Sequence, residues 1–211
     1  MSIEVEIKAW VDDPAALEAR LASIGEWQGE SIKEDVYFAP RSSSQTGADE
    51  RFRLRRSNGK AVVTFKQRRM VGNVEVNDET EFAVDDAHAF YKLASHLGCV
   101  PYMIKRKHSR LYRVGQVRVE LNRVERLGHF VEVEILCGPD EVDAARARVT
   151  EMLARLEVPP EKIEPQRYND LLHQVYPARY EFVADDPQNP FRVYPLEPLP
   201  TAPEGQTHLE D

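Results

Sequence analysis

The stretch Ile3-Glu-Val-Glu-Ile-Lys-Ala-Trp10 at the start of the chain decides the fold. Residues two apart in a β-strand point to the same face of a sheet. Glu4, Glu6 and Lys8 therefore share one face, and the apolar residues between them share the other. One side of this strand is apolar and the other is almost purely ionic.

The same alternation returns late in the chain, in Val131-Glu-Val-Glu-Ile135. Between the two acidic strands lie Arg51-Phe-Arg-Leu-Arg55, Val62-Val-Thr-Phe-Lys66 and Glu79-Thr-Glu-Phe82. The polar faces are ionic, and their charges are grouped by sign, strand by strand. This grouping predicts a sheet curled around a charged interior, where carboxylates could hold a divalent cation and basic side chains a polyanion.

The rest of the chain consists of short strand patterns joined by tight connections, of which Asn58-Gly59 is the strongest turn signal. Apolar residues at helical spacing and capping residues predict helices between them. The hairpin-like connections favour an α+β fold, an eight-stranded antiparallel β-barrel with helices packed outside, over a doubly wound sheet. The expected strands are 3–10, 31–38, 51–56, 60–68, 75–84, 103–114, 116–124 and 129–137, and the expected helices are 14–24, 86–96, 139–158 and 168–175.

Composition limits the classes of protein. The 211 residues are 42% hydrophobic and 30% charged, which is typical of a globular chain. The net charge of −8 argues against a nucleic-acid partner but permits a local basic pocket. We find no signal peptide and no apolar run that could span a bilayer, and Cys99 and Cys137 form no metal or disulfide pattern, so we expect a cytoplasmic protein. A homodimer is compatible with these observations.

We expect one domain over residues 1–176 and a proline-rich tail over 177–211. Half of the 14 prolines follow Tyr176, mixed with acidic and polar residues. Such a segment cannot form a helix or a central strand, so we expect it to be extended.

The metal candidates are the two acidic pairs, Glu4 with Glu6 and Glu132 with Glu134. Hard carboxylate oxygens suit Mg²⁺ or Mn²⁺. The alternative is a pair of solvated strand faces with glutamates paired to lysines. Two such pairs at distant positions, each flanked by apolar alternation, favour the metal.

The polyanion candidates are basic residues that alternate with apolar ones. Both faces carry cations in the stretch 105–110, so we prefer Lys105 and Lys107 as inward-facing and leave Arg110 open. Two acidic residues of the third alternating pair, Glu79 and Glu81, could support these cations as ion-pair partners or act as extra ligands. The full basic set is Lys8, Arg53, Arg55, Lys66, Lys105, Lys107 and Arg118, the last sharing a face with Glu120 and Asn122.

Six ordered segments resemble the signature of the CYTH superfamily, the triphosphate tunnel metalloenzymes, over residues 3 to 176. They are Glu4-x-Glu6-x-Lys8, Asp35-x-Tyr37-Phe38, Leu54-Arg55, Val63-Thr-Phe-Lys66, Leu127-Gly-His-Phe-Val-Glu-Val-Glu134 and Tyr168-Asn-Asp-Leu-Leu172.

This resemblance implies a tunnel whose carboxylates, Glu4, Glu6, Glu132 and Glu134, hold Mg²⁺ or Mn²⁺. It implies that the basic set grips the phosphates of ATP or another small triphosphate, and that Lys8 and Glu134 are catalytic. Members include class IV adenylyl cyclases, thiamine triphosphatases and inorganic tripolyphosphatases. The chain departs from the family pattern at Asn122, where an aspartate is common, and Glu120 on the same face is the alternative ligand.

Three functions remain open. The segments are most similar to those of class IV adenylyl cyclases, which convert ATP to cyclic AMP and pyrophosphate. A triphosphatase acting on tripolyphosphate, thiamine triphosphate or a nucleoside triphosphate would use the same binding groups. A non-catalytic polyphosphate- or nucleotide-binding module is the third alternative, and Asn122 is the feature that favours it.

Overall fold

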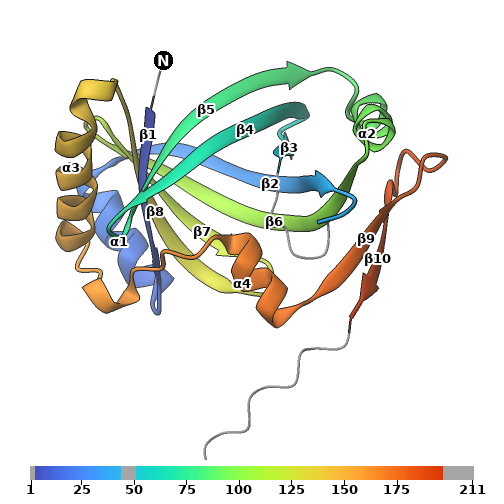
Figure 1. Ribbon diagram of the computed structural model, residues 1–211. Helices are drawn as coiled ribbons and strands as arrows, with labels where there is room; N and C mark the ends of the chain where they lie inside the picture. The colour runs from blue at the N-terminus through green and yellow to red at the C-terminus, as the bar shows by residue number, and fades with distance from the viewer. Residues whose placement is uncertain (1–2, 44–50, 197–211) are drawn as a thin grey trace, which may run out of the picture.

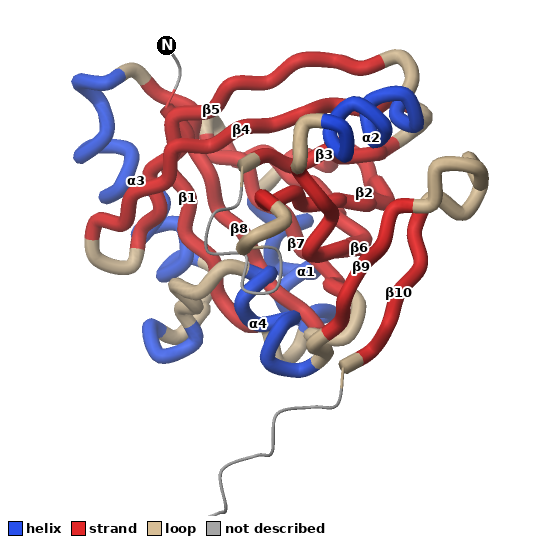
Figure 2. The backbone as a smooth tube through the Cα atoms, turned by 45° about the vertical axis from the view of Figure 1, so that its right-hand side comes forward, coloured by secondary structure: helices blue, strands red, loops and turns tan. Residues whose placement is uncertain are grey.

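The computed structural model describes residues 3–43 and 51–196. Eight strands form a closed antiparallel barrel in the order β1-β5-β4-β3-β2-β6-β7-β8 (Figures 1 and 2). The predicted α+β barrel is confirmed. The strands are β1 (Ile3–Trp10), β2 (Glu26–Pro40), β3 (Phe52–Ser57), β4 (Lys60–Val71), β5 (Val74–Val84), β6 (Cys99–Val114), β7 (Val117–Val124) and β8 (Gly128–Cys137).

The first strand closes the barrel between β5 and β8. Glu6 lies opposite Glu75 of β5 and Glu134 of β8. Because side chains alternate along a strand, this register turns the glutamates of β1 and β8 into the interior together.

Within the described residues, four α-helices pack around the barrel: α1 (Pro14–Ile24), α2 (Ala87–His96), α3 (Val142–Arg155) and α4 (Tyr168–Val175), the last of which begins at the barrel cavity. The side chain of Asp13 caps α1 by accepting hydrogen bonds from the backbone N–H groups of Ala15 and Ala16. Figure 1 shows α3 along one side of the barrel and α2 at the opposite side.

The largest apolar core lies outside the barrel, between the sheet and its helices. Val5 and Ile7 of β1 and Val133 of β8 are buried in one cluster with Val149 and Leu153 of α3. The outer faces of the strands thus supply the hydrophobic burial that stabilises the fold, which leaves the inner faces to charged side chains.

Several elements differ from the predicted bounds: β4 continues to Val71, β6 begins at Cys99, and β2 and α3 also begin at other residues. β2 begins at Glu26, earlier than the predicted residue 31, because a bulge between Trp27 and Gly29 carries the strand past the polar start of the segment. Gly29 has a φ of +115°, a conformation that favours glycine. The helix α3 begins at Val142, because Pro139–Glu141 form a 3₁₀ turn before it.

Part of the proline-rich segment forms a hairpin that the sequence analysis did not predict. Its strands are β9 (Ala178–Phe182) and β10 (Phe191–Pro195), a two-stranded sheet apart from the barrel. The ring of Phe191 lies 4.9 Å from that of Tyr91 in α2, so the hairpin packs against the barrel's outer layer. Residues 197–211 of the tail lie outside the described residues. Within the described ranges, no helix is long and apolar enough to cross a bilayer.

Candidate active site

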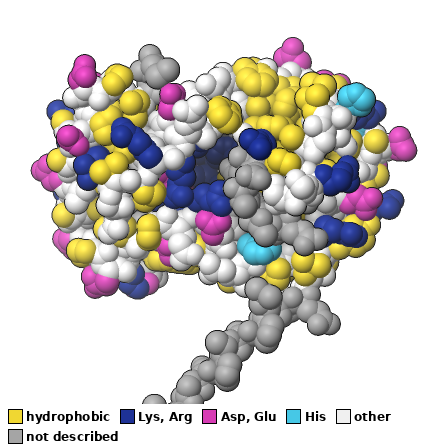
Figure 3. Space-filling model, viewed as in Figure 1, with side chains coloured by type: hydrophobic (Ala, Val, Ile, Leu, Met, Phe, Trp, Pro, Cys, Tyr) yellow, Lys and Arg dark blue, Asp and Glu magenta, His cyan; other side chains and the backbone are white. Residues whose placement is uncertain are grey.

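A cavity of about 420 Å³ occupies the barrel interior and receives side chains from all eight strands. Figure 3 shows lysine and arginine side chains gathered in a hollow on one face of the molecule. The structure brings all but one of the predicted site residues to this cavity. They are Glu4, Glu6, Lys8, Arg53, Arg55, Lys66, Glu79, Glu81, Lys105, Lys107, Arg118, Glu120, Glu132 and Glu134.

Three carboxylates form one cluster in the cavity. Oxygen atoms of Glu4, Glu6 and Glu134 lie within 4.8 Å of one another. Burial, together with the carboxylates of Glu132 and Glu4, raises the pKa of Glu6 well above its usual value. Burial and its acidic neighbours raise the pKa of Glu134 to about 7, although Arg118 opposes the shift.

The cluster suits a divalent cation. Among residues 3–43 and 51–196, Glu6 makes no hydrogen bond or ion pair, although its carboxylate stands against two others. Repulsion among buried carboxylates is relieved by a bound cation, and oxygen-only ligands favour Mg²⁺ or Mn²⁺. Glu4, Glu6 and Glu134 therefore fit the metal that the charge pattern predicted.

Glu132, the fourth predicted ligand, lies outside this cluster and is neutralised. Its carboxylate is 2.7 Å from the Lys107 ammonium and accepts a hydrogen bond of 2.8 Å from the Asn122 amide. Burial alone would raise the pKa of Glu132, but Lys107 holds it at about 2.

Asn122 is the predicted residue that the cavity does not include. Its side chain is fully buried, accepts a hydrogen bond from the Ser109 hydroxyl and donates one to Glu132. Asn122 orients Glu132 and is not a member of the carboxylate cluster. The absence of a negative charge at position 122 therefore removes no ligand from that cluster.

The cationic wall is built around Asp35, which is completely buried. Arg55 donates two hydrogen bonds to this carboxylate, and the Lys105 ammonium lies 3.2 Å from it. Arg53 follows at 3.9 Å. Burial would raise the pKa of Asp35, but these cations hold it well below its usual value. One carboxylate among three cations leaves net positive charge facing the cavity.

Lys105 is affected by this surplus. Burial lowers its pKa to about 8, with further lowering by Lys107 and the arginines, although Asp35 opposes the shift. Lys66 differs because it is paired: its ammonium lies 2.7 Å from Glu4 and also contacts Glu79. Burial lowers the pKa of Lys66, but these carboxylates raise it overall.

The other two predicted acidic residues also act as partners of neighbouring side chains. Glu81 accepts a hydrogen bond of 2.7 Å from Thr64 and lies 3.8 Å from Arg53. Glu120 is held by Arg118 at 2.6 Å and by Lys33 at 2.6 Å.

The sequence analysis missed several residues of the cavity. Lys33 of β2 was not predicted because Lys33-Glu34-Asp35 carries charges on both faces of the strand. Lys33 does share a face with Tyr37, which also lines the cavity, and this spacing could have indicated it. Asn77 is buried behind the cavity lining, where it donates hydrogen bonds of 3.0 Å to Glu4 and 2.9 Å to Glu75, and no alternating pattern marked it. The cavity residues absent from the predicted set also include Arg68, Glu75, Arg167, Tyr168 and Asn169.

Tyr168 is the central residue among these. Its ring lies under the ammonium groups of Lys8, Lys105 and Lys107, at 4.5, 4.9 and 5.8 Å from the ring centre. The side chain is buried, and burial together with the neighbouring Glu132 raises the pKa of its hydroxyl well above the usual value. The ring is a cation–π platform that faces three of the predicted phosphate-binding lysines.

The segment before α4 crosses the barrel near Tyr168. Lys8 donates a hydrogen bond to the backbone oxygen of Gln166, and the Glu164 N–H donates one of 2.8 Å to the Lys8 oxygen. These bonds anchor the crossing segment to β1.

The family model of the CYTH domain matches residues 2–168. The chain belongs to the CYTH family. The matched range contains both acidic pairs and the whole basic set, and it ends at Tyr168, the first residue of α4.

Individual relatives support the same assignment. A protein of Methanocaldococcus jannaschii, named as a candidate adenylate cyclase, is 26% identical over 171 residues, covering 80% of this chain and 98% of the relative. A solved structure from Pyrococcus horikoshii is 26% identical, with a TM-score of 0.70, and covers 80% of this chain and 98% of that one. A Hippeastrum protein, described as an adenylyl cyclase candidate with dominant triphosphatase activity, shares the fold at a TM-score of 0.58 and 16% identity, covering 82% and 94%.

Proposed function

We propose that this CYTH protein is a divalent-metal-dependent enzyme that converts ATP to cyclic AMP and pyrophosphate, as class IV adenylyl cyclases do. The observation that supports it is the single cavity in which the Glu4, Glu6 and Glu134 cluster faces a wall of lysines and arginines. The name of the M. jannaschii relative is in line with this reaction.

In this reaction the ribose 3′-hydroxyl of ATP loses its proton to solvent, and its oxygen forms a bond to the α-phosphorus. The bond from the α-phosphorus to its bridging oxygen breaks, and pyrophosphate leaves. Phosphoryl chemistry of this kind needs positioning and charge neutralisation more than covalent help from the protein. Bound Mg²⁺ or Mn²⁺ would supply Lewis-acid stabilisation of the phosphoryl oxygens.

The residues have distinct proposed roles. Glu4, Glu6 and Glu134 would hold the metal, and Glu132, which pairs with Lys107, would be a further carboxylate for it. The surplus cations around Asp35, together with Lys8, Lys66, Lys107 and Arg118, hold the triphosphate. Tyr168 keeps three of these lysines oriented toward it.

A triphosphatase is the second candidate. Every cation in the cavity is suited to phosphate oxygens, so the same wall would hold a substrate attacked by water at a terminal phosphorus. The Hippeastrum protein shows that the shared fold accommodates this activity. The non-catalytic alternative rested on Asn122, which lies behind Glu132 rather than in the metal cluster.

Product analysis separates the candidates. Purified protein is incubated with Mg²⁺ or Mn²⁺ and either ATP or tripolyphosphate, and the products are resolved by ³¹P NMR and chromatography. Cyclic AMP with pyrophosphate supports the cyclase. Release of orthophosphate from either compound would show that the protein is a triphosphatase and not a cyclase. Binding of these compounds without turnover would show that it is a binding module.

A further inference from the structure

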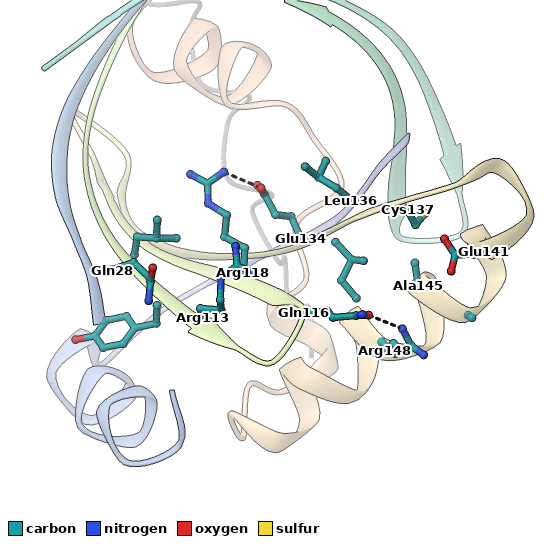
Figure 4. A pocket seen from close by; sticks show the side chains of 14 residues that line it. Gln28, Arg113, Gln116, Arg118, Glu134, Leu136, Cys137, Glu141, Ala145 and Arg148 are labelled. Carbon is teal, nitrogen blue, oxygen red and sulfur yellow. Dashed lines mark hydrogen bonds and ion pairs between the residues drawn. The ribbon is translucent and has the colours of Figure 1, made fainter. Parts of the chain in front are cut away.

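A second cavity, of about 610 Å³, borders the first. Its walls come from the turn between β6 and β7, the end of β8 and the helix α3 (Figure 4). Three side chains, Arg118, Glu134 and Leu136, line both cavities. Figure 4 shows Arg118 and Glu134 joined at the boundary, where their hydrogen bond measures 2.8 Å.

The second cavity has a different chemistry from the barrel interior. Leu136 continues the inward register of Glu132 and Glu134, yet it is apolar and 64% exposed. Leu136 therefore presents apolar surface at the place where the two cavities meet. The other apolar lining residues are Leu111, Tyr112, Ile135, Cys137, Ala144 and Ala145.

Neutral amides, planar guanidinium groups and the carboxylate of Glu141 complete the rim. Gln116 in the β6–β7 turn accepts a hydrogen bond of 3.1 Å from Arg148 of α3, and Gln28 lies across from them. At the boundary, the buried Nε of Arg118 has no hydrogen-bond partner among residues 3–43 and 51–196. Amides recognise the edges of a heterocycle, and guanidinium planes stack on its face.

We infer that this pocket receives the organic group of an organic triphosphate whose phosphates lie in the barrel, a substituent with an apolar face and hydrogen-bonding edges. This inference rests on the proposed function and deepens it. It assigns the preferred substrate to organic triphosphates rather than to tripolyphosphate, with Arg118 at the junction of the organic group and the phosphates.

The opposite end of β8 is less suited to the organic group. There Phe130 packs edge-on against Tyr168, and the segment bonded to Lys8 crosses the barrel. That end of the cavity is also lined by the positively charged side chains of Arg51 and Arg167. The α3 side instead combines an apolar surface with open volume beside the metal cluster.

The first experiment fills the pocket without altering the barrel interior. Gln116 is exposed and does not line the barrel cavity, so Gln116→Trp places an indole in the pocket alone. Leu93→Trp, on the exposed side of α2, is the matched control. For each variant, kcat/KM is measured with ATP and with tripolyphosphate. If the protein binds one compound without turning it over, the inhibition constant of that compound is measured with the other compound as substrate.

We expect Gln116→Trp to reduce kcat/KM for ATP by about tenfold or more and to change that for tripolyphosphate by less than about twofold. The control should change neither. Equal losses for both compounds, or no loss for ATP, would overturn the inference while leaving the proposed function standing. Failure of the wild-type protein to bind either compound with Mg²⁺ or Mn²⁺ would overturn the proposed function and the inference with it.

A second experiment locates the organic group directly. An azido-adenine analogue of ATP is cross-linked to the full-length protein by light, and the labelled peptides are mapped by mass spectrometry. We expect labels within residues 111–118 or 135–148. Labels confined to residues 51–52 or 167–169 would place the organic group at the other end of the barrel and overturn the inference.

Discussion

Arg55 grips Asp35 with two hydrogen bonds, its Nε at 2.6 Å from one carboxylate oxygen and its terminal nitrogen at 2.9 Å from the other. Asp35 has no exposed surface, and Lys105 and Arg53 approach the same carboxylate. A single buried anion therefore organises three cations from β3 and β6.

Replacing Asp35 with alanine should destabilise the protein strongly, because the substitution leaves buried cations uncompensated. We expect a loss of about 3–5 kcal/mol in the free energy of unfolding, measured by urea denaturation. Glu34, the next residue, pairs with Arg106 on the exposed outer face at 2.8 Å. Glu34→Gln should cost less than about 1 kcal/mol. Similar losses in the two variants would show that Asp35 does not organise the wall.

Two glutamates of the same cavity should respond to neutralisation with opposite signs. Burial and nearby carboxylates raise the pKa of Glu6, so its ionised form disfavours the folded state above the ordinary pKa. Burial alone would raise the pKa of Glu120. The neighbouring cations outweigh burial and hold this pKa well below its usual value; they are Lys107, Lys33 and Arg118. At about pH 8 without metal, we expect Glu6→Gln to raise Tm and Glu120→Gln to lower it. Shifts of the same sign would contradict this charge arrangement.

The same Glu6→Gln variant tests the metal. Mn²⁺ should raise the Tm of the wild-type protein because a ligand that binds the folded state stabilises it. The gain should be largely lost in Glu6→Gln, and a chelator should remove it from the wild type. Glu81, which is held by Thr64 and lies outside the cluster, is the control. An equal Mn²⁺ effect in Glu6→Gln and Glu81→Gln would contradict the assignment of the cluster.

Binding of a triphosphate should be accompanied by proton uptake at Lys105. Its pKa of about 8 in the free protein means that the ammonium loses its proton as pH rises through this value. A bound polyanion favours the charged form and raises the pKa, so affinity should fall as pH rises above about 8. Calorimetry with tripolyphosphate in buffers of different ionisation enthalpy measures the uptake.

Two lysine variants check the source of these protons. Lys105→Met should reduce the uptake as well as the affinity. Lys66, whose pKa its carboxylate partners raise, stays protonated in this range, so Lys66→Met should reduce the affinity but leave the uptake in place. Burial and the nearby Lys107 lower the pKa of Lys33 to about 8. Lys33 therefore accounts for any proton uptake that remains in Lys105→Met. Uptake unchanged in Lys105→Met and in Lys33→Met would contradict this explanation.

Substitutions at Tyr168 should separate the roles of its ring and hydroxyl. Tyr168→Leu removes the surface under Lys8, Lys105 and Lys107, and we expect KM for the triphosphate to rise by about tenfold, in line with desolvated cation–π contacts. Tyr168→Phe keeps the ring and should retain KM close to wild type. A rise in KM of equal size in Tyr168→Phe would assign the effect to the hydroxyl instead.

Charge alternation predicted most of the barrel and its contents, because the period of two in a strand is visible in Glu4-x-Glu6 and Glu132-x-Glu134. The alternation assigns a side chain to a face but gives no distances across the barrel. It therefore could not show that Glu132 pairs with Lys107 while Glu134 joins Glu4 and Glu6.

Other features had weaker local signals. Lys33 sits in a run charged on both faces, and Tyr168 reads as an ordinary core residue of a short helix until β1 and β6 bring their lysines over its ring. The β9–β10 hairpin lies in a proline-rich segment, a composition that disfavours central strands. The rings of Phe182 and Phe191 pack against the ring of Tyr91, a contact between distant parts of the chain that the local sequence does not indicate.

The most direct test of the tunnel as the site of metal and triphosphate binding is a crystal structure with Mn²⁺ and tripolyphosphate. We expect the anomalous signal of manganese among the carboxylates of Glu4, Glu6 and Glu134, with the phosphate chain running toward Arg55 and Lys105. Manganese or triphosphate bound only on the outer surface of the barrel would contradict the assignment.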